Sequence, residues 1–204
     1  MMYNGKSRYN MGKIYCIMGK SSSGKDTIYK RLLKNTDNRF KTIVSYTTRP
    51  IRNGETEGIE YHFVTVPEFE HMNEKGKVIE YRCYHNIHGD WYYFTENDGQ
   101  IDLSKGDYLL IMTPEGVLNL KKHFGDETVV PIYIEVETGL RLHRAVERER
   151  SQKEPKYAEL CRRFLADEED FSEDRLSELG NIRRYQNIDL DTCVLEITMD
   201  LKET

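Results

Sequence analysis

Three short apolar runs in the chain predict buried β-strands. They cover residues 13–18 (KIYCIM), 107–113 (DYLLIMT) and 129–136 (VVPIYIEV), and they are rich in β-branched and aromatic side chains. Helical periodicity is found at about 26–36, 115–124, 139–150, 156–170 and 172–183, and again near the end at Leu190, Val194, Ile197 and Leu201. Alternation of such strands and helices predicts an α/β fold with a parallel central sheet flanked by helices.

Residues 45–100 depart from this alternation because they are dense in Tyr, Arg, Gly and Glu. Stretches such as EYHFV and VIEYRCY have the two-residue period of half-buried strands. We therefore expect a β-rich subdomain inserted between the first strand unit and the strand at 107–113. Residues 1–12 precede the first periodic element, and we expect them to form a flexible leader.

Composition narrows the possible partners. The 204 residues include 30 Lys and Arg against 35 Asp and Glu, which gives a formal net charge of −5. An acidic chain has no overall positive field, so we expect no nucleic-acid and no membrane partner, and any anion must be bound locally. Because no apolar run approaches the roughly 20 residues that span a bilayer, and the start lacks an apolar signal core, a soluble cytoplasmic protein is expected. A monomer and a homodimer both fit these features.

The cysteines and histidines predict no metal or disulfide chemistry. The four cysteines lie far apart and form no C-x-x-C pair, and the six histidines have no metal-like spacing. Reduced thiols are therefore expected.

The strongest motif is GKSSSGK at residues 19–25, which lies directly after the first predicted strand and before a helical pattern. G-x-x-x-x-G-K in this context predicts a phosphate-binding loop. The glycines let successive N–H groups point at phosphate oxygens, the helix offers its positive end, and Lys25 neutralises the β and γ phosphates. The alternative is a Ser/Gly turn that only caps a helix.

A second motif, SYTTRPIRNGETEGIEYHF at residues 45–63, places Arg49 and Arg52 on either side of a proline. The proline favours an extended backbone, and two guanidinium forks in such a segment suit phosphate binding. A solvated basic turn is the alternative for this segment taken alone.

The two motifs together with GKVIEY resemble the guanylate kinase family, whose pattern is T-T-R-x-x-R-x-G-E-x-x-G-x-x-Y-x-F. The positions that match are Thr47, Thr48, Arg49, Arg52, Gly54, Glu55, Gly58, Tyr61 and Phe63. The resemblance begins at about residue 13, is strong to residue 81 and is looser afterwards. It implies a P-loop NTPase core (13–44, 101–137 and 171–204), an inserted NMP-binding subdomain (45–100) and a helical lid (138–170).

The resemblance also implies an activity, the transfer of the γ-phosphoryl group of ATP to GMP with Mg²⁺ as cofactor. The residues implied for ATP are Gly19, Lys20, Ser21, Ser22, Ser23, Gly24, Lys25, Asp26 and Thr27, with Asn187 next to the adenine. The residues implied for GMP are Ser45, Arg49, Arg52, Tyr61 and Tyr92 at its phosphate, and Glu80 at guanine N1 and N2. The catalytic residues implied are Lys25, Arg49, Arg148 and Arg163, with Arg144, Arg150 and Arg162 as rival lid arginines.

The chain departs from the family pattern in two places. After the base-binding glutamate, Tyr93 and Phe94 stand where a glycine and a hydroxyl residue are expected, so Thr95 or the Tyr93 phenol is left to donate to guanine O6. At the end of the strand at 107–113, Ile111 and Thr113 replace an Asp pair, and no carboxylate precedes Glu115.

The second departure suggests a role for Asp26, which follows the loop lysine where a Ser or Thr is usual. Mg²⁺ prefers oxygen ligands and is commonly held by one or two carboxylates. Asp26, directly or through water, and Thr27 are therefore candidate metal ligands. The competing interpretation is that Asp26 only caps the helix and interacts with its dipole.

Two other functions fit parts of the pattern. The altered base pocket fits a kinase for another nucleotide or a small phosphorylated acceptor. A noncatalytic protein-binding module is the alternative from another class, and retention of Gly24, Lys25 and both clamp arginines argues against it.

Overall fold

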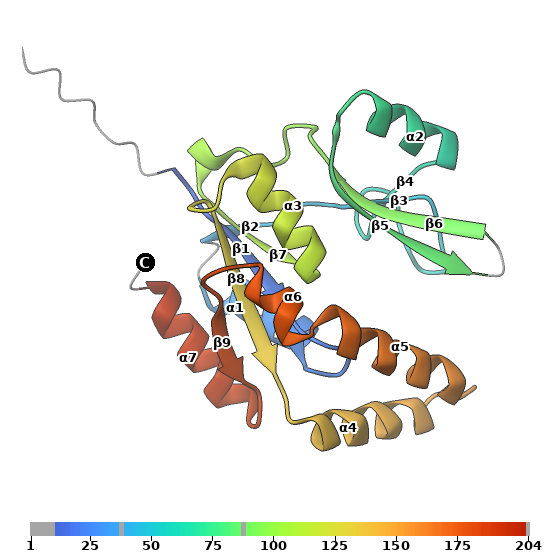
Figure 1. Cartoon of the computed structure of the whole chain (residues 1–204), viewed down its shortest axis with the longest axis vertical. Coiled ribbons are helices and arrows are strands. Elements are labelled where there is room, and N and C mark those ends of the chain that lie inside the picture. Colours follow the sequence, from blue (N-terminus) through green and yellow to red (C-terminus); the bar gives the residue numbers. More distant parts are fainter. Residues whose placement is uncertain (1–10, 37–38, 87–88, 203–204) are drawn as a thin grey trace, which may run out of the picture.

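The computed structural model describes residues 11–36, 39–86 and 89–202, and residues 1–10 of the expected leader lie outside this description. Five parallel strands form the central sheet in the order β2-β7-β1-β8-β9 (Figure 1). Their bounds are β1 Ile14–Met18, β2 Phe40–Lys41, β7 Asp107–Ile111, β8 Val129–Glu135 and β9 Arg183–Gln186. The α/β fold with a parallel sheet is confirmed.

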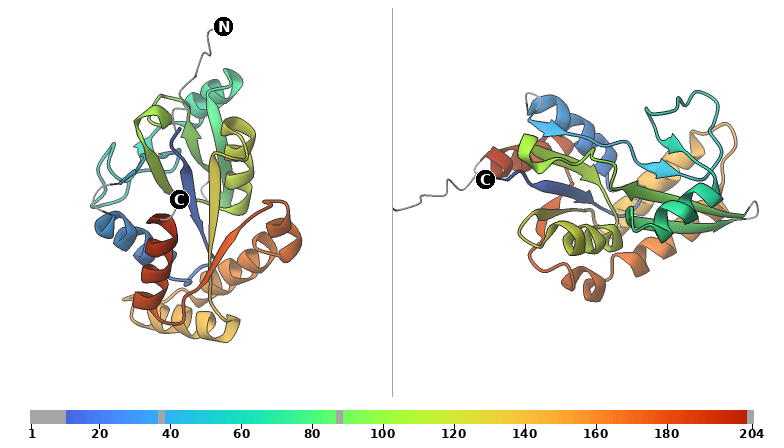
Figure 2. Two further views of the ribbon diagram at one scale, coloured as in Figure 1. Left: turned by 90° about the vertical axis from the view of Figure 1, so that its left-hand side faces the viewer. Right: turned by 90° about the horizontal axis from the view of Figure 1, so that it is seen from above.

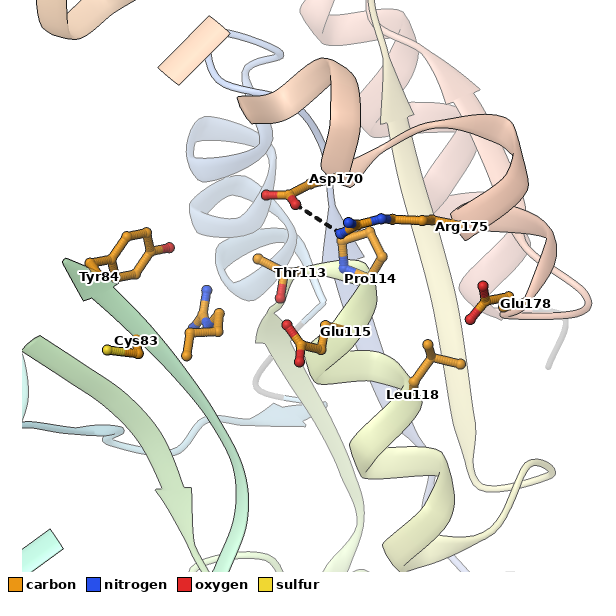
Figure 3. A pocket seen from close by; sticks show the side chains of 10 residues that line it. Cys83, Tyr84, Thr113, Pro114, Glu115, Leu118, Asp170, Arg175 and Glu178 are labelled. Atoms are coloured by element: carbon orange, nitrogen blue, oxygen red, sulfur yellow. Dashed lines mark hydrogen bonds and ion pairs between the residues drawn. The ribbon is translucent and has the colours of Figure 1, made fainter. Parts of the chain in front are cut away.

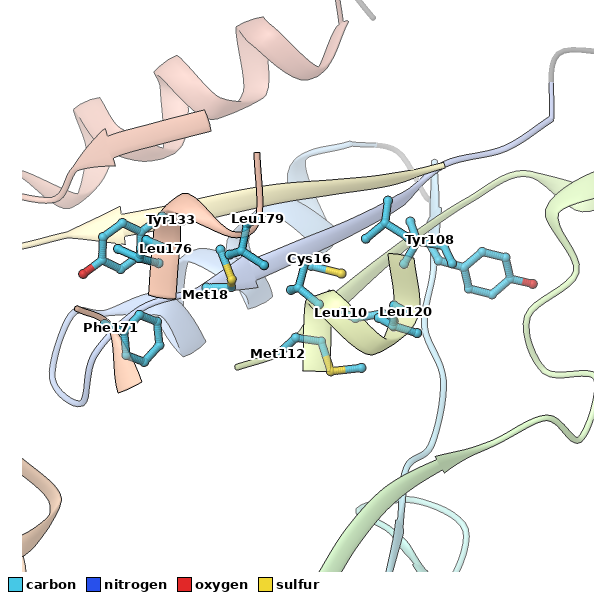
Figure 4. Packing of buried hydrophobic residues seen from close by; sticks show 13 residues of the cluster. Cys16, Met18, Tyr108, Leu110, Met112, Leu120, Tyr133, Phe171, Leu176 and Leu179 are labelled. Atoms are coloured by element: carbon cyan, nitrogen blue, oxygen red, sulfur yellow. The ribbon is translucent and has the colours of Figure 1, made fainter. Parts of the chain in front are cut away.

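Helices cover both faces of this sheet (Figure 2). Tyr15 and Ile17 of β1 pack with α1 (Lys25–Asn35) and α7 (Leu190–Lys202). Ile14, Cys16 and Met18 face the opposite way, toward α3 (Pro114–Phe124) and α6 (Glu173–Ser177) (Figure 4). Since alternate residues of a strand point to opposite faces, a strand buried on both sides must be apolar throughout.

A second, four-stranded sheet has the order β4-β3-β6-β5 and lies beside the central sheet (Figure 1). Its strands are β3 Tyr46–Thr47, β4 His62–Phe63, β5 Val78–Asn86 and β6 Gly89–Glu96. Helix α2 (Val66–Glu74) packs on one face through Phe69, and it begins at a capping box formed by Thr65 and Glu68. This short helix was not predicted from the β-rich pattern of the segment.

Helices α4 (Thr138–Arg150) and α5 (Tyr157–Asp170) form a hairpin that follows β8 (Figure 1). Buried Glu149 closes the hairpin, because its carboxylate accepts hydrogen bonds from the backbone N–H of Lys156 and the side chain of Gln152. A short 3-10 helix, η1 (Leu103–Lys105), precedes β7.

The helix predicted at 172–183 is wrong in its second half. Helix α6 ends at Ser177, Gly180 adopts a φ of 72° that other residues rarely adopt, and the chain then enters β9. The sequence of β9, RRYQ, buries only Tyr185, so it carries too few apolar positions to be recognised as a strand. Among the described residues, no helix is both long and apolar enough to cross a bilayer.

Candidate functional site

The loop between β1 and α1 has no room for side chains at its two motif glycines. A Cβ on Gly19 would lie 2.5 Å from Ser23 Oγ, and one on Gly24 would lie 2.4 Å from Asn187 Nδ2. Gly24 also adopts a φ of 85°, and Ser22 adopts a φ of 66°, which is uncommon for a residue with a side chain. The curled backbone expected for a phosphate-binding loop is therefore present, and its glycines are required by contacts.

The loop contains two buried hydroxyl groups that make no hydrogen bond to the described residues. Within the described residues, the hydroxyls of Ser22 and Ser23 are buried and have no hydrogen-bond partner. Buried polar groups in proteins are normally satisfied, so orphaned hydroxyls beside a curled backbone fit the oxygens of a bound phosphate. Lys25 opens α1 and lies 3.5 Å from the Asp26 carboxylate.

Asp26 and Thr27 lie in the first turn of α1, and both are exposed; 72% of the Asp26 side chain is accessible. An exposed carboxylate and an exposed hydroxyl at the mouth of a phosphate-binding loop fit a hard cation bound with phosphate oxygens. The two residues therefore fit the predicted magnesium site. The same exposure also fits a simple electrostatic role at the helix N-terminus.

Asn187, which follows β9, supports the loop from behind. Its buried Nδ2 donates to the Ser23 carbonyl at 2.7 Å, while its Oδ1 is buried with no hydrogen-bond partner in the described part of the chain. Arg144 of α4 donates to the carbonyls of Asn187 and Ile188 at 3.1 and 3.2 Å. Asn187 is thus part of the loop's wall, and its predicted contact with adenine stays a prediction.

The lid helices reach the loop through carboxylates. The backbone N–H of Ser21 donates to Asp167 at 2.7 Å, and Lys20 pairs with Glu168 at 2.7 Å. Arg141 of α4 is almost fully buried between them, where it forms ion pairs with both Asp167 and Glu168. One loop N–H and one loop lysine are therefore engaged by α5 in this arrangement.

The two arginines predicted for the lid do not approach the loop here. Arg148 is exposed on α4, and Arg163 lies 3.6 Å from Glu159 of its own helix. Arg141 instead reaches the Ser21 carbonyl at 3.4 Å. No motif distinguishes Arg141 from the other arginines of LRLHRAVERER, so its contact with the loop could not be predicted from the sequence and is seen only from its burial in the structure.

The predicted phosphate clamp is assembled around Arg49. Only 4% of Arg49 is exposed, and its guanidinium makes two parallel hydrogen bonds to Glu55 at 2.7 and 2.6 Å. The rings of Tyr61 and Phe63 lie 5.1 and 5.3 Å from the guanidinium carbon. The Arg49 guanidinium lowers the pKa of the Glu55 carboxyl to about 2, so the pair stays ionised at neutral pH. The guanidinium plane is thereby fixed.

The other clamp residues lie nearby. Arg52 is exposed, and its backbone N–H donates to Glu55 at 2.8 Å, which leaves the Arg52 side chain available for a ligand. Ser45 is half-buried just before β3, and its carbonyl accepts the N–H of His62.

The structure corrects the assignment of Tyr92. Its ring stacks on Phe69 of α2 at 4.2 Å, on the face of the second sheet that is turned away from Arg49. Neighbouring strand residues point to opposite faces, so Tyr93 lies on the Arg49 face, with its ring 5.6 Å from that of Tyr61. Glu55 and, more weakly, Tyr93 raise the pKa of Arg49. The tyrosine that faces Arg49 is therefore Tyr93, one position later than the residue predicted from the sequence.

The shift by one residue also places a hydroxyl beside Glu80. Glu80 on β5 and Thr95 on β6 are cross-strand partners, and Thr95 Oγ1 donates to Glu80 Oε1 at 2.8 Å. Glu80 is 3% exposed, and within the described residues its Oε2 is buried without a hydrogen-bond partner, although Arg82 Nε lies 4.0 Å away. Burial raises the pKa of Glu80, although Arg82 and Thr95 oppose the increase. A buried carboxylate oxygen without a donor suits a ligand that presents N–H groups.

A cavity of about 490 Å³ lies between β5 of the second sheet and the core helices α3 and α6. Its lining comprises Arg82, Cys83 and Tyr84 of β5, Thr113, Pro114, Glu115 and Leu118 at α3, and Asp170, Arg175 and Glu178 near α6 (Figure 3). Thr113 caps α3 by accepting the Gly116 N–H, so it does not replace the carboxylate expected at this strand end. Glu115 and Asp170 supply carboxylates to the cavity instead.

Comparisons with known proteins support the resemblance seen in the motifs. Residues 11–173 match the sequence model of the family described as guanylate kinase. The guanylate kinase of Neisseria gonorrhoeae is 39% identical over 106 residues, which cover 52% of this chain and 49% of that protein. That of Clostridioides difficile is 44% identical over 79 residues, 38% of each chain. The chain thus spans about half the length, or less, of these curated relatives.

The fold has a counterpart among solved structures. The crystal structure of guanylate kinase from Anaplasma phagocytophilum superposes with a TM-score of 0.59 at 24% sequence identity, and the match covers 95% of this chain and 86% of that chain. At this identity the likeness concerns the fold alone. Because the family model spans most of the chain and includes both anion-binding motifs, this chain belongs to the guanylate kinase family.

Proposed function

We propose that this protein is an ATP-dependent guanylate kinase that transfers the γ-phosphoryl group of ATP to GMP, with Mg²⁺ as cofactor, to give ADP and GDP. The observation that carries the proposal is the buried Glu80 carboxylate. One of its oxygens accepts a hydrogen bond from Thr95, and the other has no hydrogen-bond donor among the described residues, although Arg82 Nε lies 4.0 Å away. Guanine offers N1–H and N2–H on one edge and the O6 acceptor beside them. Glu80 presents the acceptor for the two N–H groups, and the Thr95 hydroxyl, which donates to Glu80 in this structure, turns its proton toward O6 when guanine binds.

The donor triphosphate binds at the loop between β1 and α1. The loop N–H groups and the buried hydroxyls of Ser22 and Ser23 contact phosphate oxygens, and Lys25 neutralises the charge on the β and γ phosphates. Bound Mg²⁺ would supply further charge neutralisation at the phosphates, and Asp26 and Thr27 are the residues placed to hold it. Gly19 and Gly24 allow the close approach of the backbone.

The acceptor binds on the second sheet. Arg49, held in one plane by Glu55, contacts the GMP phosphate together with Ser45, Arg52, Tyr61 and Tyr93. A fixed guanidinium loses little conformational freedom on binding, so its hydrogen bonds hold the acceptor oxygen in line with the γ-phosphate.

The lid supplies the remaining positive charge. Arg148 and Arg163 remain the candidates for contact with the transferring phosphate after α4 and α5 close, while Arg141 holds α5 against the loop. Phosphoryl transfer of this kind depends on alignment and charge neutralisation and needs no strong general base. None of these roles requires a histidine.

An acceptor screen tests the proposed activity. With ATP and Mg²⁺, we expect GMP to be phosphorylated about 10⁴-fold more efficiently than AMP, CMP or UMP. The reason is that the buried Glu80 carboxylate would have no matching N–H donors when another base binds.

The loop lysine is tested by a pair of variants. Lys25→Met should lower kcat by about 10² or more, whereas Lys30→Met, on the exposed side of α1, should leave it unchanged. Turnover is followed by ADP release.

Two outcomes would reject the proposal. A preference for another acceptor would replace GMP as the substrate. Calorimetry that detected binding of neither ATP nor GMP would instead favour a noncatalytic protein-binding module.

The adjacent tyrosines Tyr92 and Tyr93 provide a matched pair of variants. Tyr93→Phe should raise the KM for GMP about tenfold, since it removes one hydrogen bond to a charged phosphate, worth about 1.5 kcal/mol. Tyr92→Phe should change KM less than about twofold, because the Tyr92 ring faces α2. Steady-state kinetics at saturating ATP measure both values, and a larger effect of Tyr92→Phe would contradict the assignment of Tyr93.

Base recognition by Glu80 predicts a pH dependence. Guanosine is the suitable probe because it carries no phosphate that titrates. Burial raises the pKa of Glu80 above 4.5, so the carboxylate gains a proton, and loses its acceptor function, at a higher pH than an ordinary glutamate does. Guanosine affinity should therefore be full well above the raised pKa and fall about tenfold per pH unit below it.

NMR titration of the wild-type protein and of Glu80→Gln measures this effect. The Glu80→Gln variant should bind guanosine weakly at every pH, and its affinity should not fall further at low pH. A wild-type profile that stayed flat down to pH 4.5 would exclude Glu80 as the base-reading group.

The role of Asp26 is tested by its metal dependence. If Asp26 holds Mg²⁺, Asp26→Ala should raise the Mg²⁺ concentration for half-maximal rate about tenfold or more, and Asp26→Ser should raise it less because a hydroxyl remains at this position. Asp126→Ala, at an exposed aspartate between α3 and β8, is the control. Normal Mg²⁺ dependence in both Asp26 variants would leave Asp26 with only a helix-capping role.

A further inference from the structure

A cluster of three different ligand types lies on the hairpin formed by β5 and β6, and none of its members has a part in the proposed phosphoryl transfer. Cys83 and His85 are two residues apart on β5, so their side chains share one face of the strand. Asp90 on β6 lies directly opposite His85 in the register of the two strands. His85 Nδ1 is 2.6 Å from Asp90 Oδ1 and 3.9 Å from Cys83 Sγ.

We propose that Cys83, His85 and Asp90 form a binding site for one zinc-type divalent ion. One ligand atom from each residue, a sulfur, a nitrogen and an oxygen, lies within 4.8 Å of the other two. Zn²⁺ binds such atoms at about 2.3 Å for sulfur and about 2.0 to 2.2 Å for nitrogen and oxygen. An ion between the three atoms would therefore need only small side-chain rotations.

The mixed donor set decides which class of metal fits. A thiolate and an imidazole favour zinc and its chemical relatives, whereas Mg²⁺ prefers oxygen ligands alone. Three protein ligands leave a fourth tetrahedral position for water, which is the arrangement of zinc sites that keep an open position. The site is therefore chemically distinct from the proposed magnesium site at Asp26.

A simpler interpretation accounts for only part of this cluster. His85 and Asp90 alone could be a cross-strand surface ion pair, since both side chains are largely exposed, 81% and 47%. That interpretation does not explain the thiol of Cys83 beside the imidazole. Among the described cysteines, Cys16 and Cys193 are buried in the core and Cys161 is exposed on α5, so only Cys83 lies in a group of potential ligands.

Binding has a defined proton balance. The Cys83 thiol gives up its proton when sulfur bonds to the ion, and His85 binds as neutral imidazole in place of its hydrogen bond to Asp90.

Metal titration of the purified full chain tests the site. With Zn²⁺ against a chromophoric chelator, we expect one equivalent to bind, and Cys83→Ser, His85→Ala and Asp90→Asn each to weaken binding tenfold or more. With Co²⁺ as a spectroscopic probe, we expect a thiolate-to-cobalt charge-transfer band. Cys161→Ser, the matched variant of an exposed cysteine outside the cluster, should retain both the affinity and the band.

Two results would overturn the proposal: full Zn²⁺ affinity in Cys83→Ser, or loss of binding in Cys161→Ser. Circular dichroism and thermal melting identify any variant that fails to fold, and the exposed positions of His85 and Asp90 make these two variants informative if Cys83→Ser is unstable. The site does not depend on the proposed kinase activity, because metal binding is measured without nucleotide.

Discussion

The burial of β1 on both faces is the constraint on which the rest of the structure depends. Its five residues are fully buried between α1 with α7 on one side and α3 with α6 on the other. Because β1 is held in this way, its last residue has a fixed position. Helix α1 begins seven residues later and is also fixed by the core. The connecting loop must curl in the space that remains, where Gly19 and Gly24 meet side chains and backbone at distances that exclude a Cβ. Packing in the core thus sets the geometry of the anion site.

The second site depends on a different principle, the burial of charge with incomplete compensation. Arg49 is buried, and its two hydrogen bonds to Glu55 keep its guanidinium rigid. Glu80 is buried with one oxygen hydrogen-bonded to Thr95, whereas among the described residues its other oxygen has no hydrogen-bond partner and lies 4.0 Å from Arg82. A buried carboxylate oxygen without a hydrogen bond costs stability, which is expected where a protein keeps an acceptor ready for a ligand. Arg49 is thus held in one orientation, and Glu80 keeps one acceptor oxygen without a hydrogen bond.

The lid contacts show how the loop and helix α5 are connected. On α5, Asp167 accepts a hydrogen bond from a backbone N–H of the loop, and Glu168 forms an ion pair with a lysine of the loop. Arg141 of α4 balances the negative charge of these carboxylates. Anionic side chains therefore lie where the proposed phosphates would add negative charge. Entry of a triphosphate must rearrange these contacts, so the position of α5 and the filling of the loop are coupled through electrostatics.

Local pattern in the sequence was sufficient for the strand β1, the loop and the clamp, because each depends on neighbours a few residues apart. Gly24, Lys25, Arg49 and Arg52 were predicted in this way, and their roles in binding stay predictions. The position of Tyr93 was missed because one residue of register moves a side chain to the other face of a strand, and no local signal fixes that register. The strand β9 was missed because it buries only one side chain.

The sequence by itself determined the alternation of strands and helices and the residue types that can bind phosphate, since these follow from periodicity and spacing, and the resemblance of its motifs indicated the family. The tertiary structure decided which of those residues meet. It paired Glu80 with Thr95 across two strands, brought Arg141 to the loop from more than a hundred residues away in sequence, and gathered Cys83, His85 and Asp90 on one hairpin face. Such contacts arise from the pairing and packing of distant segments, which no local pattern encodes.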